Sequence, residues 1–106
     1  MENHPLGSQF FMPLDPFDNL VAVAEAKSTV MPEDVLVFSS SHKQGVNFKL
    51  GVWHHPLLVL AEQQDFLVID RAGAGENLVE QDLASPIMVD LDEINPQGKL
   101  EPRPRQ

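Results

Sequence analysis

From residue 35 onward the chain is a succession of short apolar runs separated by polar turns. The runs VLVFS (35–39) and VNFKLGVW (46–53) flank a polar turn that contains Gly45, and together they predict a β-hairpin. In the second run the even-numbered residues are expected to face the core, so that Trp53 faces outward. Four further runs, LLVLA, FLVID, LVEQDL and IMVDLDEI, predict additional short strands.

Residues 16–27 carry a helical pattern instead. Asp15 can cap a helix, and Pro16 suits the first helical position. The apolar residues that follow the i, i+3, i+4, i+7 spacing of one helix face are Phe17, Leu20, Val21 and Ala24. The pattern predicts a helix over 16–27. The expected fold is mainly β, a small antiparallel β-barrel or sandwich of about six strands with one N-terminal helix and extended terminal arms.

The two ends differ from the middle of the chain. Residues 1–14 are broken by prolines and a glycine yet contain Phe10, Phe11 and Met12, which predicts an apolar arm packed on its own domain or on a neighbouring subunit. Residues 15–94 are expected to form one compact domain. Residues 95–106 are rich in proline and charge and are expected to form an extended tail.

Composition narrows the classes of function. The 106 residues include no cysteine, which excludes disulfides, thiolate metal sites and cysteine nucleophiles. The net charge is −9, and no basic patch of the kind found in nucleic-acid binders occurs in the body of the chain. Residues 62–93 carry nine carboxylates against Arg71, a net charge of −8, whereas the last eight residues carry a net charge of +2. This distribution indicates either a basic partner or a role in solubility.

Neither a secretory leader nor a membrane span is predicted. The first residues lack a basic segment followed by an apolar one, and no apolar run approaches the roughly 20 residues of a membrane helix. We therefore expect no membrane partner.

The stretch GVWHHP (51–56) holds the single tryptophan and two adjacent histidines. Neighbouring side chains in a strand point to opposite faces, so His54 and His55 are not expected to share one metal ion. A metal site would need His42 or an acidic residue from elsewhere. The preferred interpretation is a surface corner, with Trp53, His54 and His55 as an alternative contact patch.

Two other patterns are weak candidates for chemistry. Asp90 and Asp92 share one face of a predicted strand, but that face is expected to be solvated, which leaves both carboxyls with ordinary acidity. In RAGAGEN (71–77) the two glycines form a GxG, but the third glycine and the following helix of a phosphate-binding loop are missing, so an ordinary hairpin loop is expected. The sequence therefore predicts no catalytic residues, no metal and no cofactor.

One resemblance covers roughly residues 17–94. Phe17, Asp18, Asn19 and Leu20, followed later by Gly51, Val52, Trp53 and Pro56, are similar to motifs of the small head–tail joining proteins of lambda-like tailed phages. That resemblance implies a small β-barrel without an active site, whose arms order against neighbours in a ring or shell. Its partners would be other virion proteins or copies of itself, and its location the virion or the host cytoplasm during assembly.

The leading hypothesis is thus a non-enzymatic assembly protein, either a head–tail connector or a capsid decoration component. The alternative is an acidic inhibitor or immunity-type protein that covers a basic site or mimics nucleic acid. A small hydrolase or metal enzyme is a third hypothesis, and loss of activity on replacing His54 or His55 would favour it. The candidate interface residues are Phe10, Phe11, Met12, Trp53, His54, His55, Asp90, Asp92, Arg103 and Arg105.

Overall fold

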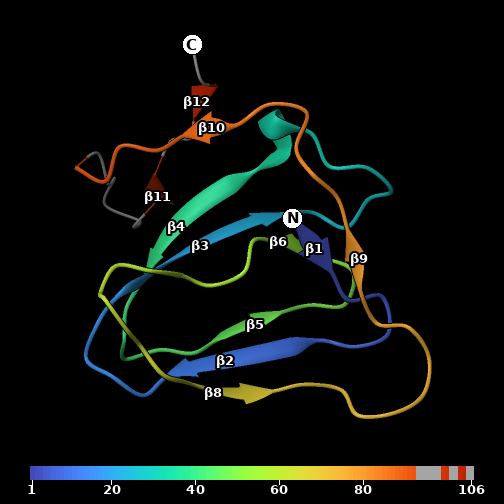
Figure 1. Cartoon of the computed structure of the whole chain (residues 1–106), viewed down its shortest axis with the longest axis horizontal. Coiled ribbons are helices and arrows are strands. Elements are labelled where there is room, and N and C mark those ends of the chain that lie inside the picture. The colour runs from blue at the N-terminus through green and yellow to red at the C-terminus, as the bar shows by residue number, and fades with distance from the viewer. Residues whose placement is uncertain (93–98, 101–102, 105–106) are drawn as a thin grey trace.

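The computed structural model of the chain describes residues 1–92, 99–100 and 103–104. It is built mainly of antiparallel β-strands, with one short 3-10 turn, η1 (Pro32–Asp34), as the helical element among the described residues. The strands form three sheets, and the lower one in Figure 1 (β5-β2-β8) lies beneath the larger sheet that contains β3 and β4. The expectation of a mainly β, antiparallel fold is confirmed. A closed barrel is not shown, because strand pairing among the described residues leaves the sheets separate.

The largest sheet has seven strands in the order β11-β4-β3-β6-β1-β9, with β7 also paired to β3. Their bounds are β1 Glu2–Asn3, β3 Asn19–Ala24, β4 Leu36–Ser40, β6 Trp53–His54, β7 Leu58–Val59, β9 Val79–Glu80 and β11 Lys99–Leu100. The second sheet has the order β5-β2-β8, with bounds β2 Gln9–Pro13, β5 Val46–Phe48 and β8 Phe66–Ile69. The third pairs β10 (Ile87–Met88) with β12 (Arg103–Pro104).

The predicted helix over 16–27 is wrong, because this segment contains β3 at the centre of the large sheet. Four of the six β3 residues are buried, Asn19 among them, so the segment is enclosed on both faces rather than along one stripe. Asp15, expected to cap the helix, accepts a hydrogen bond from the Asp65 backbone N–H at 2.7 Å. Because a strand buried on both faces is a continuous apolar run, its composition also satisfies a helical spacing.

The predicted hairpin of 35–39 with 46–53 is also wrong. β4 lies in the large sheet and β5 in the three-stranded sheet, so the two strands are not paired. A turn at Gly51 splits the run 46–53, and its φ of 78° is a left-handed conformation that glycine adopts readily. After this turn the chain enters β6 in the large sheet. This turn resets the alternation. Trp53 is therefore buried rather than outward-facing, and its Nε1–H donates to the Lys27 carbonyl at 2.8 Å.

The hydrophobic core lies against the large sheet. Its buried members are Ala22, Ala24, Val30, Val35, Val37, Trp53 and Leu100. Leu58, Leu83 and Ile87 pack against this core while remaining partly exposed. The core thus draws its strand residues from β3, β4, β6 and β11 of the large sheet.

The first 14 residues supply β1 to the large sheet and β2 to the second sheet. Of the predicted tail over 95–106, only residues 99–100 and 103–104 lie within the described part of the chain. No helix in the described ranges has the length and hydrophobicity needed to cross a membrane.

Candidate functional site

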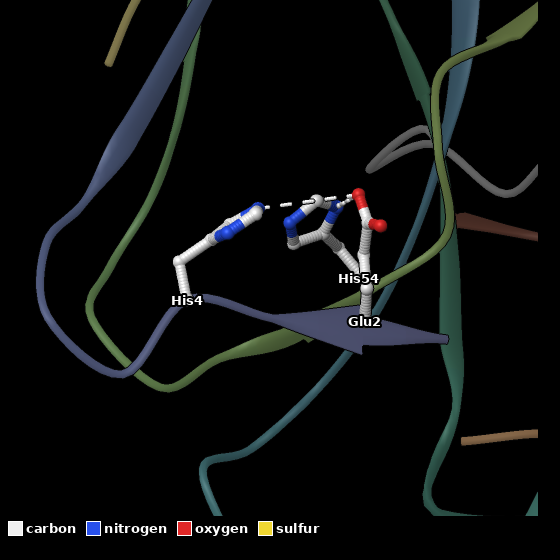
Figure 2. A group of neighbouring side chains, drawn as sticks. All are labelled: Glu2, His4 and His54. Carbon is white, nitrogen blue, oxygen red and sulfur yellow. Dashed lines mark ion pairs between the residues drawn. The ribbon is translucent and has the colours of Figure 1, made fainter. Parts of the chain in front are cut away.

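Glu2, His4 and His54 bring their polar side-chain atoms together at one edge of the core (Figure 2). One carboxylate oxygen and one nitrogen from each ring all lie within 4.8 Å of one another. Glu2 Oε1 lies 3.9 Å from His4 Nε2 and 4.0 Å from His54 Nδ1. The His54 residue is only 1% exposed, whereas the side chains of His4 and Glu2 are 12% and 23% exposed. The cluster is therefore largely buried, and Glu2 is its most exposed member.

Strand geometry explains why these residues meet. Glu2 of β1 and His54 of β6 are direct partners across an antiparallel pair, and such partners project to the same face of the sheet. His4 follows Glu2 by two residues in an extended segment, which also directs it to that face. Three side chains from two distant parts of the chain are thereby gathered on one side of the sheet.

Hydrogen bonds place a proton on Nδ1 of both rings. His4 Nδ1 lies 2.6 Å from the Asn77 carbonyl oxygen, and His54 Nδ1 lies 3.3 Å from the His55 carbonyl oxygen. A carbonyl oxygen only accepts, so in each ring Nδ1 carries the proton and donates it. In the neutral rings the lone pair is consequently on Nε2. Neither Nε2 atom, although buried, has a hydrogen-bond partner among the described residues.

The environment of His54 favours the neutral imidazole. Burial lowers the pKa of His54 below its ordinary value of 6.5, although the His55 carbonyl and the Glu2 carboxylate act in the opposite direction. The ring also stacks on Phe48, with centroids 4.1 Å apart and an interplanar angle of 7°. His54 is thus a neutral imidazole at neutral pH, with its proton on Nδ1.

Two imidazoles and one carboxylate are a set of groups that bind first-row divalent metal ions. The hydrogen bonds from Nδ1 to backbone carbonyls match the outer-sphere pattern that orients metal-bound histidines. Two buried, unpartnered Nε2 atoms further fit a group that would accept their lone pairs. The three residues therefore fit a divalent cation.

The other histidines lie elsewhere. His55 is exposed, on the opposite side of the strand from buried His54, and its Nδ1 contacts the Pro56 carbonyl at 2.8 Å. His42, the expected supplier of a second metal-binding ring, contacts Asp18 Oδ1 at 2.9 Å. The prediction of no metal considered His42 and an unspecified acid, but not Glu2 with His4.

The remaining predicted interface residues are dispersed. Phe11 packs edge-on against Phe48 and Phe66 in the second sheet, next to Phe10 and Met12 in β2. Asp90 and Asp92 belong to a turn in which the Asp92 N–H donates to Asp90 Oδ1 at 2.9 Å. Arg103 lies in β12, and Arg105 lies outside the described residues. Within the described part of the chain, the Glu2–His4–His54 cluster includes none of these interface candidates.

Sequence reasoning missed Glu2 and His4, because residues 1–14 were interpreted as an arm. A usable signal was present, since a carboxylate and an imidazole two residues apart share a face if the segment is extended. Their approach to His54 depends on the pairing of β1 with β6, which no local pattern reveals.

The fold and the cluster together define an antiparallel β protein with a histidine–carboxylate site between strands. A sequence model described as ureidoglycolate lyase matches residues 1–90, and the chain belongs to this family. It is 51% identical to the ureidoglycolate lyase of Azotobacter vinelandii over 80 residues, which are 76% of this chain and 48% of that protein. It is 45% identical to the Burkholderia mallei enzyme over 94 residues, which are 89% of this chain and 55% of that protein.

The ureidoglycolate lyase of Stutzerimonas stutzeri is 48% identical over 80 residues, or 76% of this chain and 47% of that protein. The chain thus spans about half the length of the curated relatives that it matches. These similarities overturn the resemblance to phage head–tail joining proteins and the assignment as a virion component. They also overturn the prediction of a non-enzymatic protein, and they give no support to the acidic inhibitor. The phage motifs were short strings of residues that carry no chemistry and are therefore weak evidence of kinship.

Proposed function

We propose that this chain acts in the ureidoglycolate lyase reaction and that Glu2, His4 and His54 form part of its active site. Membership of the family supports the reaction class. The observation that carries the placement of the site is that two histidines grouped with the Glu2 carboxylate each have a buried Nε2 atom without a partner. Unpartnered polar atoms in a recess are costly unless a ligand or ion pairs with them.

The chemistry of the substrate explains what such a site must do. Ureidoglycolate carries a carboxylate, a hydroxyl and a ureido group on one carbon. In a lyase reaction the hydroxyl loses its proton and a carbon–oxygen double bond forms. The carbon–nitrogen bond then breaks, and the leaving nitrogen takes a proton. The products are glyoxylate and urea, and no water is consumed.

Charge determines how the cluster can serve this reaction. With neutral rings and ionised Glu2 the cluster carries a net charge of −1, which repels an anionic substrate. A divalent cation held by the three side chains would change the net charge to +1 and favour both the substrate carboxylate and the developing alkoxide. Glu2, His4 and His54 then act as ligands, and His54 stays neutral because it is buried.

Glyoxylate release from ureidoglycolate tests the proposal. Two samples are assayed: the chain alone, and the chain mixed with the part of the Azotobacter vinelandii enzyme that it does not match. Each sample is measured as prepared, after chelation, and after resupply of Zn²⁺ or Co²⁺. We expect activity that chelation abolishes and that Glu2→Gln or His54→Gln reduces at least a hundredfold. His55→Gln is the matched control, and we expect it to retain activity. Absence of glyoxylate under both conditions would refute the proposed reaction.

A further inference from the structure

The loop over residues 71–77 folds back onto the segment that carries His4. The Arg71 guanidinium donates to the Ala74 carbonyl at 2.9 Å and closes the loop on itself. Gly75 has a φ of 97°, and a Cβ there would lie 2.9 Å from Leu6 Cδ1. This close approach shows that the loop packs directly against the chain next to the cluster.

Asn77, the last residue of this loop, contacts the site segment twice. Its carbonyl oxygen accepts the proton of His4 Nδ1 at 2.6 Å. Its side-chain Oδ1 accepts the Leu6 backbone N–H at 2.8 Å. The two bonds hold the chain on both sides of Pro5, so the position of the loop and the orientation of the His4 ring are linked.

We propose that Asn77 is the positioning residue of the site, which fixes His4 in the tautomer that presents the Nε2 lone pair to Glu2 and His54. The carbonyl supplies the acceptor for Nδ1–H, and the side-chain amide oxygen keeps that carbonyl in place. For the role of His4 as a ligand, the inference rests on the proposed function. The tautomer itself follows from the hydrogen bonds alone.

A second hydrogen-bond acceptor near His4, the Glu2 carboxylate, explains why the tautomer needs to be fixed. Glu2 Oε1 lies 3.9 Å from His4 Nε2, so a His4 ring released from Asn77 has a carboxylate toward which Nε2–H can turn. In that tautomer the lone pair lies on Nδ1 and points away from the cluster. Loss of the Asn77 contact therefore converts His4 from a lone-pair donor at the site into a proton donor to Glu2.

The variants follow from the way Asn77 is used. The bond to Leu6 needs only an acceptor, so Asn77→Asp retains it, whereas Asn77→Ala removes it. Gly75→Ala keeps Asn77 but strains the loop that carries it, because alanine disfavours the positive φ of 97° at this position. Asn47→Ala, an exposed asparagine in β5, is the matched control.

The first measurement is the tautomer of His4, by ¹⁵N NMR of the histidine rings in the metal-free chain, with His4→Gln to assign the signals. Wild type, Asn77→Asp and Asn47→Ala should show the proton on Nδ1. Asn77→Ala and Gly75→Ala should shift the ring toward Nε2–H while the amide spectrum of the core strands stays unchanged. An Asn77→Ala ring that keeps Nδ1–H as wild type does would overturn the inference.

The second measurement is calorimetric titration with Zn²⁺ alone. Outer-sphere partners of metal-bound histidines contribute about 10–100-fold to affinity, so we expect Asn77→Ala to weaken binding by that factor. Asn77→Asp should bind at least as tightly as wild type. Equal affinity of Asn77→Ala and wild type would contradict the positioning role.

These results are separable from the lyase assay. A chain that shifts its tautomer as expected but releases no glyoxylate would refute the proposed reaction and leave the role of Asn77 intact. Conversely, glyoxylate release with an unchanged tautomer in Asn77→Ala would refute the positioning role alone.

Discussion

Residues 1–56 and residues 57–92 contribute differently to the molecule. Of the described residues, every buried one lies between Asn3 and His54, with Leu100 as the exception. Residues 57–92 contain eight carboxylates and a single basic residue, Arg71. The strands of this region, β7, β8, β9 and β10, contain no buried residue. The first region is a packed scaffold, whereas the second is an acidic covering of loops and short strands.

The candidate site draws on both regions. Glu2, His4 and His54 come from the scaffold, but the acceptor that orients His4 belongs to Asn77 in the covering. A segment that contributes little to the core can therefore still orient a partly buried ring of the site. Stability and site geometry are expected to respond to different substitutions.

The largest effect on stability is expected in the scaffold. Trp53→Ala removes a ring that is 1% exposed and the hydrogen bond to the Lys27 carbonyl, which should lower the free energy of unfolding by about 3–5 kcal/mol. Urea denaturation measures this loss. Leu60→Ala, at a residue 52% exposed in the covering, is the control. A comparable loss in Leu60→Ala would contradict the division between the regions.

Gln81 is the point at which the covering supports the scaffold. Its side-chain amide donates to the Val30 carbonyl at 2.8 Å and accepts the Val30 N–H at 3.0 Å, and Val30 is fully buried. Gln81→Ala leaves both backbone groups unpaired and should cost about 1–3 kcal/mol. Thermal unfolding checks this. A shift no larger than that of Gln63→Ala, at an exposed glutamine in the same region, would show that water replaces both bonds.

Acid should destabilise the chain through His54. Its pKa is lowered in the folded state, so as the pH falls below 6.5 the unfolded chain takes up the proton first. This contribution to stability is complete above pH 6.5. It is lost at up to about 1.4 kcal/mol per pH unit, until the pH reaches the folded pKa. Denaturation across this range in the metal-free chain should give a flatter profile for His54→Gln, and an unchanged one for His55→Gln. Parallel profiles for wild type and His54→Gln would contradict the assignment.

The smallest effect is expected at the edge strand β8. Ile69 is 59% exposed, and Ile69→Thr should change the free energy of unfolding by no more than about 0.5 kcal/mol. Chemical denaturation beside Val21→Thr, at a buried residue of β3, would sharpen the comparison. A large loss at Ile69 would show that this strand is covered in solution.

The β class could be predicted from the sequence, because short runs of β-branched and aromatic residues between polar turns mark strands such as β4 and β8. The character of β3 could not, since burial on both faces removes the alternation and Asp15-Pro16 imitates a helix start. Trp53 was misplaced because one glycine turn, at Gly51, shifts the alternation. The sequence singled out His54, but together with His55, and its actual partners Glu2 and His4 reach it only through pairing between distant segments.

The parallel stack of Phe48 on His54 has a spectroscopic consequence. Protons of the imidazole lie in the shielding region above the phenyl ring, so their resonances should be displaced upfield from those of the other three histidines. The displacement depends steeply on the spacing of the rings. It therefore provides a native reporter, without any label, of whether the strand bearing His54 stays in place when the site is filled.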